Sequence, residues 1–429
     1  MESGNINVDE LIQEVASQIK ADRSSASGLS YNPFPVSGIS GTGDSPVLPP
    51  IAHEARAQVR EFLSVALSSQ KFVGLTVVGD YGLGKTHVLR WIEHIVNATR
   101  TKLGDRLIRA YYVSNPRGRP IDVLMAVTGA IGEEEFRKML WSIVAQNIRE
   151  QYKAGGTRAV RSMFQAENTN YGLLIADDKA VEELVDPDAL TSLPQFRAAF
   201  SRTMLPPVAL RVFVEKSLTE VPINRDVARA FVSMLLDDDI RAFSSWVSLT
   251  SSEAQKPVRV PQEDYFRSIL AVLKRNGIGP VLLLIDEFED VAGLRLTPRQ
   301  RAEYLATLRL LIDAHIDDFG LVLALAPEAW TVTIETYSAL SDRLGRRVDL
   351  RPLSREHATE LVTNYLAVAR GSKSVDDPIA PFTQEAIAAL VRRSKGNTRA
   401  FLSACYQVLH RNWESEVIDE TLVGASTSI

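Results

Sequence analysis

The sequence contains a single cysteine, Cys405, among its 429 residues. One cysteine cannot form a disulfide within the chain or build a thiolate metal site, so neither can hold this fold together. The six histidines are scattered along the chain and form no close ligand pair. The sequence therefore offers no metal centre made from cysteine or histidine side chains.

Long apolar runs are also missing. No stretch approaches the roughly 20 apolar residues that span a bilayer, and the first residues lack the apolar core of a signal peptide. Lysine and arginine number 48 against 53 aspartates and glutamates, a net charge of −5. This balance gives no general attraction to nucleic acid or membranes, although a local basic patch stays open. We expect a soluble, cytoplasmic protein with no membrane partner.

The most informative segment is a complete phosphate-binding loop. It follows the apolar run 74–78 and precedes an amphipathic helix at 85–98. Its glycines let the backbone wrap phosphate oxygens, Lys85 would reach the β- and γ-phosphates, and the Thr86 hydroxyl would bind magnesium. The candidate nucleotide-binding residues are Gly79, Asp80, Tyr81, Gly82, Leu83, Gly84, Lys85, Thr86 and His87.

A second apolar run, 281–285, ends in Asp286 and Glu287. An aspartate at the tip of a buried strand would hold the same magnesium ion, and Glu287 could polarise the attacking water. Glu289 and Asp290 extend the acidic run, and a solvated helix start is favoured for them over a second cation site. Together with the phosphate loop, this segment predicts binding of ATP with Mg²⁺, followed by hydrolysis.

Alternating strands and helices predict an α/β fold with a parallel sheet covered on both faces. Strands are expected at 74–78, 107–113, 281–285, 320–326 and 348–350. Amphipathic segments without strands predict a large all-helical insertion at about 120–279, with helices at 121–131, 133–152, 178–185, 193–204, 207–218, 225–236, 240–247 and 262–276. The expected domains are an N-terminal helix and flexible linker (1–50), an ATPase core containing the insertion (51–351) and a helical lid (352–429).

The N-terminal part divides into two pieces. Residues 8–21 have helical periodicity, and this helix could dock on a partner subunit or pack on its own body. Residues 24–50 are rich in serine, glycine and proline, a composition that favours a linker without a core.

Arginines near the lid are candidates for sensing nucleotide. Arg399 begins a lid helix in the context 396–399 and could fold over the γ-phosphate, although a solvated arginine is the alternative. The turn 341–347 is also rich in arginine. Arg343, then Arg346 and Arg347, could reach the γ-phosphate of a neighbouring subunit.

The alternative for that turn is a surface charge cluster paired with Asp342 and Asp349. The strand 320–326 ends in Ala326 and Pro327, which cannot orient water, and Glu328 is only a possible substitute. Slow hydrolysis, suited to a switch, is expected.

One region of the sequence is a candidate for contact with nucleic acid. Basic residues at 100–109 and 117–119 could face a phosphate backbone, against the alternative of an ordinary charged surface. Tyr111 and Tyr112 lie in a strand and are expected in the core.

The order of these parts resembles the AAA+ class of P-loop ATPases, in its initiator-type branch of origin-recognition and helicase-loader proteins. The carrying residues are Gly79–Thr86, Asp286 with Glu287, the turn 343–347, and Gly396–Arg399 on a helical lid. The resemblance covers about residues 51 to 411. It implies an AAA+ P-loop NTPase core and a homo-oligomer with ATP at subunit interfaces.

A closer resemblance is to ATP-binding proteins of bacterial BREX phage-defence systems. It rests on residues 78–90, 284–289 and 224–230, followed by Trp246. About 18 residues follow Arg411, too few for the winged-helix DNA-binding domain of origin-recognition proteins, so DNA contact would come from the ATPase ring or a partner.

Three functions remain open on the sequence. The leading hypothesis is an ATP-driven switch that oligomerises and recruits or loads a partner protein, on DNA, in anti-phage defence. The partner would bind the helical insertion or the N-terminal helix. The alternatives are a monomeric ATPase whose insertion senses a ligand, and a nucleotide-binding scaffold with negligible hydrolysis.

Overall fold

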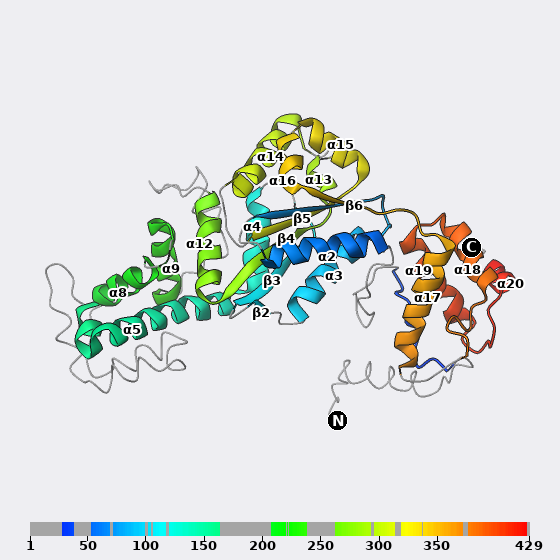
Figure 1. Cartoon of the computed structure of the whole chain (residues 1–429), viewed down its shortest axis with the longest axis horizontal. Coiled ribbons are helices and arrows are strands. Elements are labelled where there is room, and N and C mark those ends of the chain that lie inside the picture. Colours follow the sequence, from blue (N-terminus) through cyan, green and yellow to red (C-terminus); the bar gives the residue numbers. More distant parts are fainter. Residues whose placement is uncertain are drawn as a thin grey trace, which may run out of the picture.

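The structure is a computed structural model of the whole chain (Figure 1). It describes residues 28–37, 53–68, 72–98, 102–103, 106–116, 120–163, 207–219, 221, 223–237, 262–292, 296–313, 319–336, 338–371 and 376–426. Among the described helices, none has the length and apolarity needed to cross a membrane.

A twisted sheet lies at the centre of the molecule (Figure 1). In the described residues it has six strands in the order β2-β3-β4-β5-β1-β6. They are β1 (Val73–Val78), β2 (Lys102–Leu103), β3 (Arg106–Val113), β4 (Ile278–Ile285), β5 (Phe319–Leu325) and β6 (Arg346–Asp349). Only the short β2, which the sequence did not predict, runs antiparallel to its neighbour. The other strands are parallel, so their carboxyl ends share one edge of the sheet.

Helices cover both faces of the sheet, and strand alternation decides which side chains they meet. Leu75 and Val77 of β1 pack with α2 (His53–Ser68) and α3 (Lys85–Ala98) in one core cluster. Leu321 and Leu323 of β5 belong to the cluster on the opposite face. The helices of that second face are α4 (Pro120–Ile131), α13 (Glu289–Ala292), α14 (Pro298–Asp313), α15 (Pro327–Thr336) and α16 (Ser338–Leu344). The predicted α/β fold class, with a parallel sheet between helices, is confirmed.

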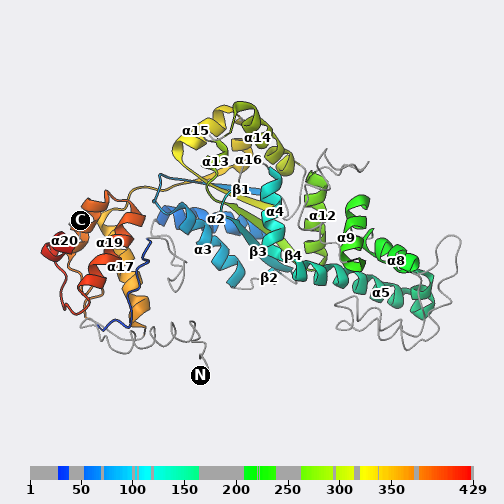
Figure 2. The same cartoon turned by 180° about the vertical axis from the view of Figure 1, so that it is seen from behind.

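A helical arm leaves the sheet between β3 and β4. Its described helices are α5 (Glu133–Met163), α8 (Pro207–Thr219), α9 (Arg225–Leu236) and α12 (Gln262–Arg275). Fully buried Phe231 packs edge-to-face on Phe136 and Tyr265, with ring centroids 5.2 and 5.9 Å away. Figures 1 and 2 show the arm and the lid at opposite ends of the molecule. The helices predicted at 178–185, 193–204 and 240–247 lie outside the described residues.

The lid follows β6 and is helical, as predicted. It contains α17 (Arg355–Arg370), α18 (Gln384–Ser394), α19 (Thr398–Arg411) and α20 (Glu420–Ser426). Ser354, Thr383 and Asn397 cap the first three of these helices through side-chain oxygens that accept a backbone N–H. The short α20 was not predicted.

Residues 28–37, which we call the lid strap, correct the interpretation of 24–50 as a linker without a core. Leu29 and Phe34 are only 3% and 2% exposed and belong to the lid core. The Phe34 ring lies 5.4 Å from Tyr365 and 5.9 Å from Phe382, centroid to centroid. The prolines on either side of Phe34 favour extended backbone, which presents this ring to the lid without a helix or strand. The helix predicted at 8–21 lies outside the described residues.

Candidate nucleotide site

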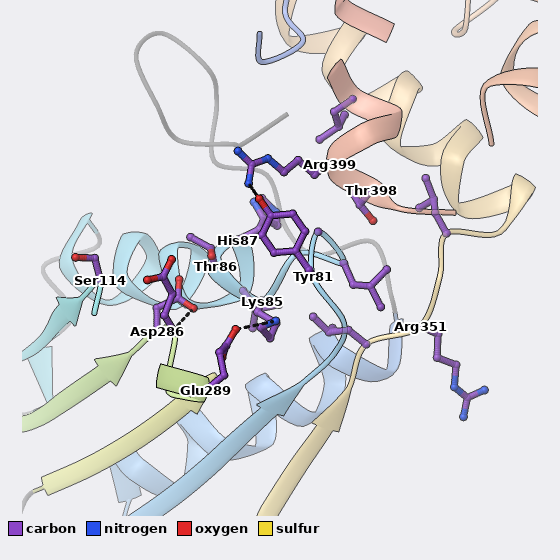
Figure 3. Close-up of a pocket in the computed structure, with 18 of the residues that line it drawn as sticks. Tyr81, Lys85, Thr86, His87, Ser114, Asp286, Glu289, Arg351, Thr398 and Arg399 are labelled. Carbon is purple, nitrogen blue, oxygen red and sulfur yellow. Dashed lines mark hydrogen bonds and ion pairs between the residues drawn. The ribbon is translucent and has the colours of Figure 1, made fainter. Parts of the chain in front are cut away.

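A cavity of about 490 Å³ opens between the sheet edge and the lid (Figure 3). Its walls come from the loop after β1, the ends of β3 and β4, the β6–α17 connection and the lid. Tyr81 through His87 all line it, as do Asp286, Glu287 and Arg399. Gly79 is buried at the base of the loop and Asp80 is exposed, and neither lines the cavity.

The phosphate loop has the backbone that its glycines predict. Gly82 and Gly84 have φ angles of +81° and +102°, in the left-handed region that side chains rarely adopt. The loop passes directly into α3, where Val88 N–H donates to the Gly84 carbonyl at 3.0 Å. The N-terminal residues of a 14-residue helix therefore open on the cavity, an arrangement that favours anions.

Lys85 is held inside this loop. Its side chain is 8% exposed, and Nζ donates to the Gly79 carbonyl at 2.8 Å. Nζ also lies 3.6 Å from Oε1 of Glu289 (Figure 3). Glu289 begins α13, as the expectation of a helix start has it, but its side chain is only partly exposed and lines the cavity, which was not expected. The sequence could not place it because the contact joins two segments far apart in the chain.

Asp286 is 2% exposed and held by two donors. The Tyr112 hydroxyl donates to Oδ2 at 2.8 Å, and the Glu287 N–H donates to Oδ1 at 2.9 Å. Burial, followed by the charge of Asp286, raises the pKa of Tyr112, so its hydroxyl stays protonated. The guanidinium of Arg90 lies over the Tyr112 ring, 3.5 Å from its centroid. Tyr111 is buried as expected. Tyr112 is partly buried against the core cluster that contains Leu75 and Val77, and it also lines the cavity.

Glu287 is exposed and has a φ of +51°, which is rare outside glycine. The side-chain amide of Asn115 donates to Glu287 Oε2 at 3.0 Å and to Asp290 Oδ2 at 2.8 Å. Sequence reasoning missed Asn115. Asn115 lies just after the carboxyl end of β3, as Asp286 lies just after the carboxyl end of the neighbouring parallel strand β4. A polar side chain at the end of a predicted strand was therefore the sequence feature that could have identified Asn115.

The lid touches the phosphate loop directly. The Arg399 N–H donates to the Gly82 carbonyl at 3.0 Å, and the side chain of Asn397 donates to the Tyr81 carbonyl at 2.7 Å. The Arg399 guanidinium donates to the Tyr81 hydroxyl and lies 5.4 Å from the Tyr81 ring centroid (Figure 3). Its Nε also donates to the Ser37 carbonyl of the lid strap at 3.1 Å. Arg399 thus joins the loop, the lid and the strap. Its contact with a γ-phosphate stays a prediction.

The other candidate arginines lie away from this cavity. Arg343 is in the last turn of α16, and its Nε donates to Asp313 Oδ1 at 2.8 Å. Hydrogen bonds from Arg343 and then Arg309 lower the pKa of Asp313. Arg346 pairs with Glu61 at 3.3 Å, and Arg347 pairs with Asp349, as in the surface-cluster alternative. The basic residues 117–119 lie outside the described part of the chain.

The donor set fits a magnesium ion that travels with a nucleotide. No group of three or more histidine, cysteine, aspartate or glutamate side chains able to hold a metal occurs among the described residues. Magnesium in nucleotide sites takes one or two protein ligands together with phosphate oxygens and water. Thr86 and Asp286 both line the cavity and supply two oxygen ligands of the kind expected.

No protein-family model matches the sequence, and no curated protein matches it. Solved structures similar to it include the Aeropyrum pernix ORC2 protein in ADPNP–ADP complexes, with 14% identity, a TM-score of 0.45, and 91% of this chain and 70% of that chain covered. The ADP form of that protein is 12% identical, with a TM-score of 0.43, and the match covers 91% of this chain and 71% of that chain. The A. pernix ORC1 protein in complex with DNA is 12% identical, with a TM-score of 0.39, and the match covers 89% of this chain and 65% of that chain. At these values the function has to be argued from the site itself.

Proposed function

We propose that this chain binds ATP with magnesium between its core and its lid, and hydrolyses the γ-phosphate. The observation that carries the proposal is a single cavity onto which the phosphate loop, Asp286 with Glu287, and Arg399 of the lid all open. These groups come from different parts of the sequence, and each has a role in the reaction. The phosphate loop neutralises phosphate charge, Asp286 binds the metal, Glu287 acts as the general base, and Arg399 connects the lid to the nucleotide.

The chain's own groups divide the work as follows. Lys85 and the first N–H groups of α3 take the phosphate charge, and Thr86 and Asp286 hold the metal. When bound, magnesium neutralises phosphate charge and orients the oxygens for in-line attack. Glu287 polarises the attacking water once its carboxylate leaves Asn115. The adenine ring of the nucleotide lies against the apolar side chains that line the cavity, Leu350, Leu353, Leu361 and Leu402.

Turnover should be slow. Ala326 follows β5 without a polar side chain, and Pro327 opens α15. Glu328 is exposed and does not line the cavity, which argues against it as a substitute. With a weakly oriented water, the ATP state would persist long enough to act as a signal, so a switch fits the site better than a motor.

The lid contacts support a switch that reports nucleotide to the rest of the chain. A nucleotide in the cavity would meet the loop and Arg399 together, so binding would bias the lid position. We extend the proposal to ATP-dependent self-association, with Arg343 reaching a neighbouring subunit, and to a partner protein bound by the helical arm. Loading of that partner on DNA, in anti-phage defence, rests on the sequence resemblance alone.

Nucleotide binding tests the core of the proposal. Lys85→Ala should weaken binding of a fluorescent ATP analogue by about 100-fold or more, because a buried cation is lost from the phosphate loop. Arg299→Ala, which removes an exposed cation paired with Glu303 and outside the cavity, is the matched control and should bind like the parent. Equal binding by Lys85→Ala and the parent would exclude this cavity as the nucleotide site. Tight binding without any phosphate release would support the scaffold alternative.

Assembly is tested by size-exclusion chromatography with light scattering. The switch proposal expects a larger species with ATP than without it. A protein that stays monomeric with ATP would favour the sensor alternative, in which the helical arm receives a ligand.

A further inference from the structure

Glu289 occupies a fixed place beside the phosphate loop. The residue before it, Phe288, is fully buried, donates its N–H to the Ala324 carbonyl at 3.0 Å and packs against Tyr304. This anchoring brings Glu289 Oε1 to 3.6 Å from Lys85 Nζ (Figure 3). The other oxygen, Oε2, is buried and has no hydrogen-bond partner in the described part of the chain. A buried carboxylate oxygen without a donor is costly, so the arrangement calls for a physical reason.

The charge of Lys85 supplies that reason. Its ammonium is nearly buried, and its hydrogen-bond acceptor at 2.8 Å, the Gly79 carbonyl, is neutral. A buried cation needs a counterion, and Glu289 provides one from within the chain. The phosphates of a nucleotide would need the same ammonium. Glu289 and the phosphates therefore compete for one cation.

We infer that Glu289 is an internal competitor of the nucleotide phosphates, which neutralises Lys85 in the empty site and makes tight nucleotide binding depend on magnesium. The inference rests on the proposed function. A metal-free triphosphate has to displace Glu289 and then lie close to three carboxylates that line the cavity, Asp286, Glu287 and Glu289. The cation that enters with a metal-bound nucleotide offsets this repulsion, so the penalty from Glu289 falls mainly on the metal-free ligand.

If Glu289 had a different role, removing its charge would change nucleotide affinity in a different way. If its free oxygen instead bound the metal or a metal-bound water, removing its charge would weaken only the metal-bound nucleotide. The direction of the change without metal therefore separates a competitor from a ligand.

The experiment measures the Kd of fluorescent ATP in magnesium and in EDTA for the full chain and for Glu289→Gln. We expect the variant to bind about tenfold more tightly in EDTA and to differ from the parent by less than about threefold in magnesium. Without nucleotide, the variant should also melt at a lower temperature than the parent, because Lys85 loses its counterion. Saturating ATP should remove that difference.

The matched control is Glu328→Gln, which removes the same charge from an exposed residue near the carboxyl end of β5, outside the cavity. It should keep the parent's affinity in both conditions. Unchanged or weaker binding by Glu289→Gln in EDTA would overturn the inference while leaving the nucleotide site standing. A parent protein that binds no nucleotide in either condition would instead overturn the proposed function.

Discussion

The side chain of Asn397 serves two structures at once. Its oxygen accepts the Ala400 N–H at 3.0 Å and caps α19, while its amide donates to the Tyr81 carbonyl at 2.7 Å inside the phosphate loop. Gly82 allows this approach, because a Cβ there would lie 2.4 Å from the Asn397 side-chain oxygen. The start of a lid helix is thus built against the loop that meets the phosphates.

Asn397→Asp separates the two roles. Aspartate is an equally good cap, but it has no donor for the Tyr81 carbonyl and sets a negative charge against it. We expect unchanged thermal stability and a loss of ATP affinity of about fivefold, the value of one hydrogen bond of about 1 kcal/mol. Thr383→Ala is the control, since it removes the cap of α18, away from the loop. It should lower stability by about 1 kcal/mol and leave affinity unchanged. Parent-like affinity in Asn397→Asp would mean that the lid contact does not support binding.

Asn115 restrains the candidate base. Asn115→Ala should release the Glu287 carboxylate and raise the basal ATPase rate by about fivefold, the equivalent of one hydrogen bond, with ATP affinity unchanged. Phosphate release under saturating ATP measures this effect. Glu287→Gln should bind ATP but block turnover, both alone and combined with Asn115→Ala. A rate that falls in Asn115→Ala would show that the amide orients Glu287 for the reaction instead of holding it back.

Tyr112→Phe tests the hydroxyl that holds Asp286. The magnesium concentration for half-maximal ATP binding should rise about threefold to tenfold, because one of the two donors that fix the metal ligand is lost. The raised pKa of Tyr112 keeps its hydroxyl protonated, so this difference should not change between pH 6 and pH 9. Tyr111→Phe makes the same chemical change on the opposite face of β3 and should leave the magnesium requirement as it is. The same shift in both variants would argue for a general effect on the strand.

The lid strap can be tested without nucleotide. Phe34→Ala removes a ring that is 2% exposed and should lower the free energy of unfolding by about 3 kcal/mol. Val36→Ala, two residues away at a side chain 66% exposed, should change it by less than about 0.5 kcal/mol. Chemical denaturation monitored by circular dichroism measures both variants. Equal stabilities would contradict the place of the strap in the lid core.

Arg343 provides the test of subunit geometry. If it acts on a neighbour, Arg343→Ala should lose most ATPase activity while binding ATP like the parent. Mixing it with Lys85→Ala should restore part of the activity, because some interfaces then pair an intact loop with an intact arginine. Its bond to Asp313 would have to open in the assembly. Full activity of Arg343→Ala would remove this residue from the site and leave Arg346 and Arg347 as candidates.

Local signals in the sequence were enough to predict the main strands and the phosphate loop. The apolar runs at 74–78 and 281–285 and the glycines of the loop carry strong patterns, and the structure places them in β1, β4 and the turn between β1 and α3. The two-residue β2 has no such pattern, because so short a strand depends on its partner β3.

The contacts that complete the candidate site were not predictable in the same way. Asn115 and Tyr112 matter because β3 lies beside β4, and Glu289 matters because the start of α13 lies beside Lys85. Neither neighbour relation can be read from one sequence without knowing the order of strands in the sheet. The strap was missed for a related reason, since Leu29 and Phe34 find their apolar partners only in the lid.

The strap also bears on how the chain folds as it is made. The amide of Asn32 donates to the Tyr406 carbonyl at 3.0 Å, although the two residues are 374 positions apart. On the ribosome the strap therefore emerges long before the helices that receive it, and the lid core can close only after the segment around Tyr406 has been made. Because Arg399 bonds both the strap and the phosphate loop, a newly made chain would acquire its finished lid and its full nucleotide site in the same late step.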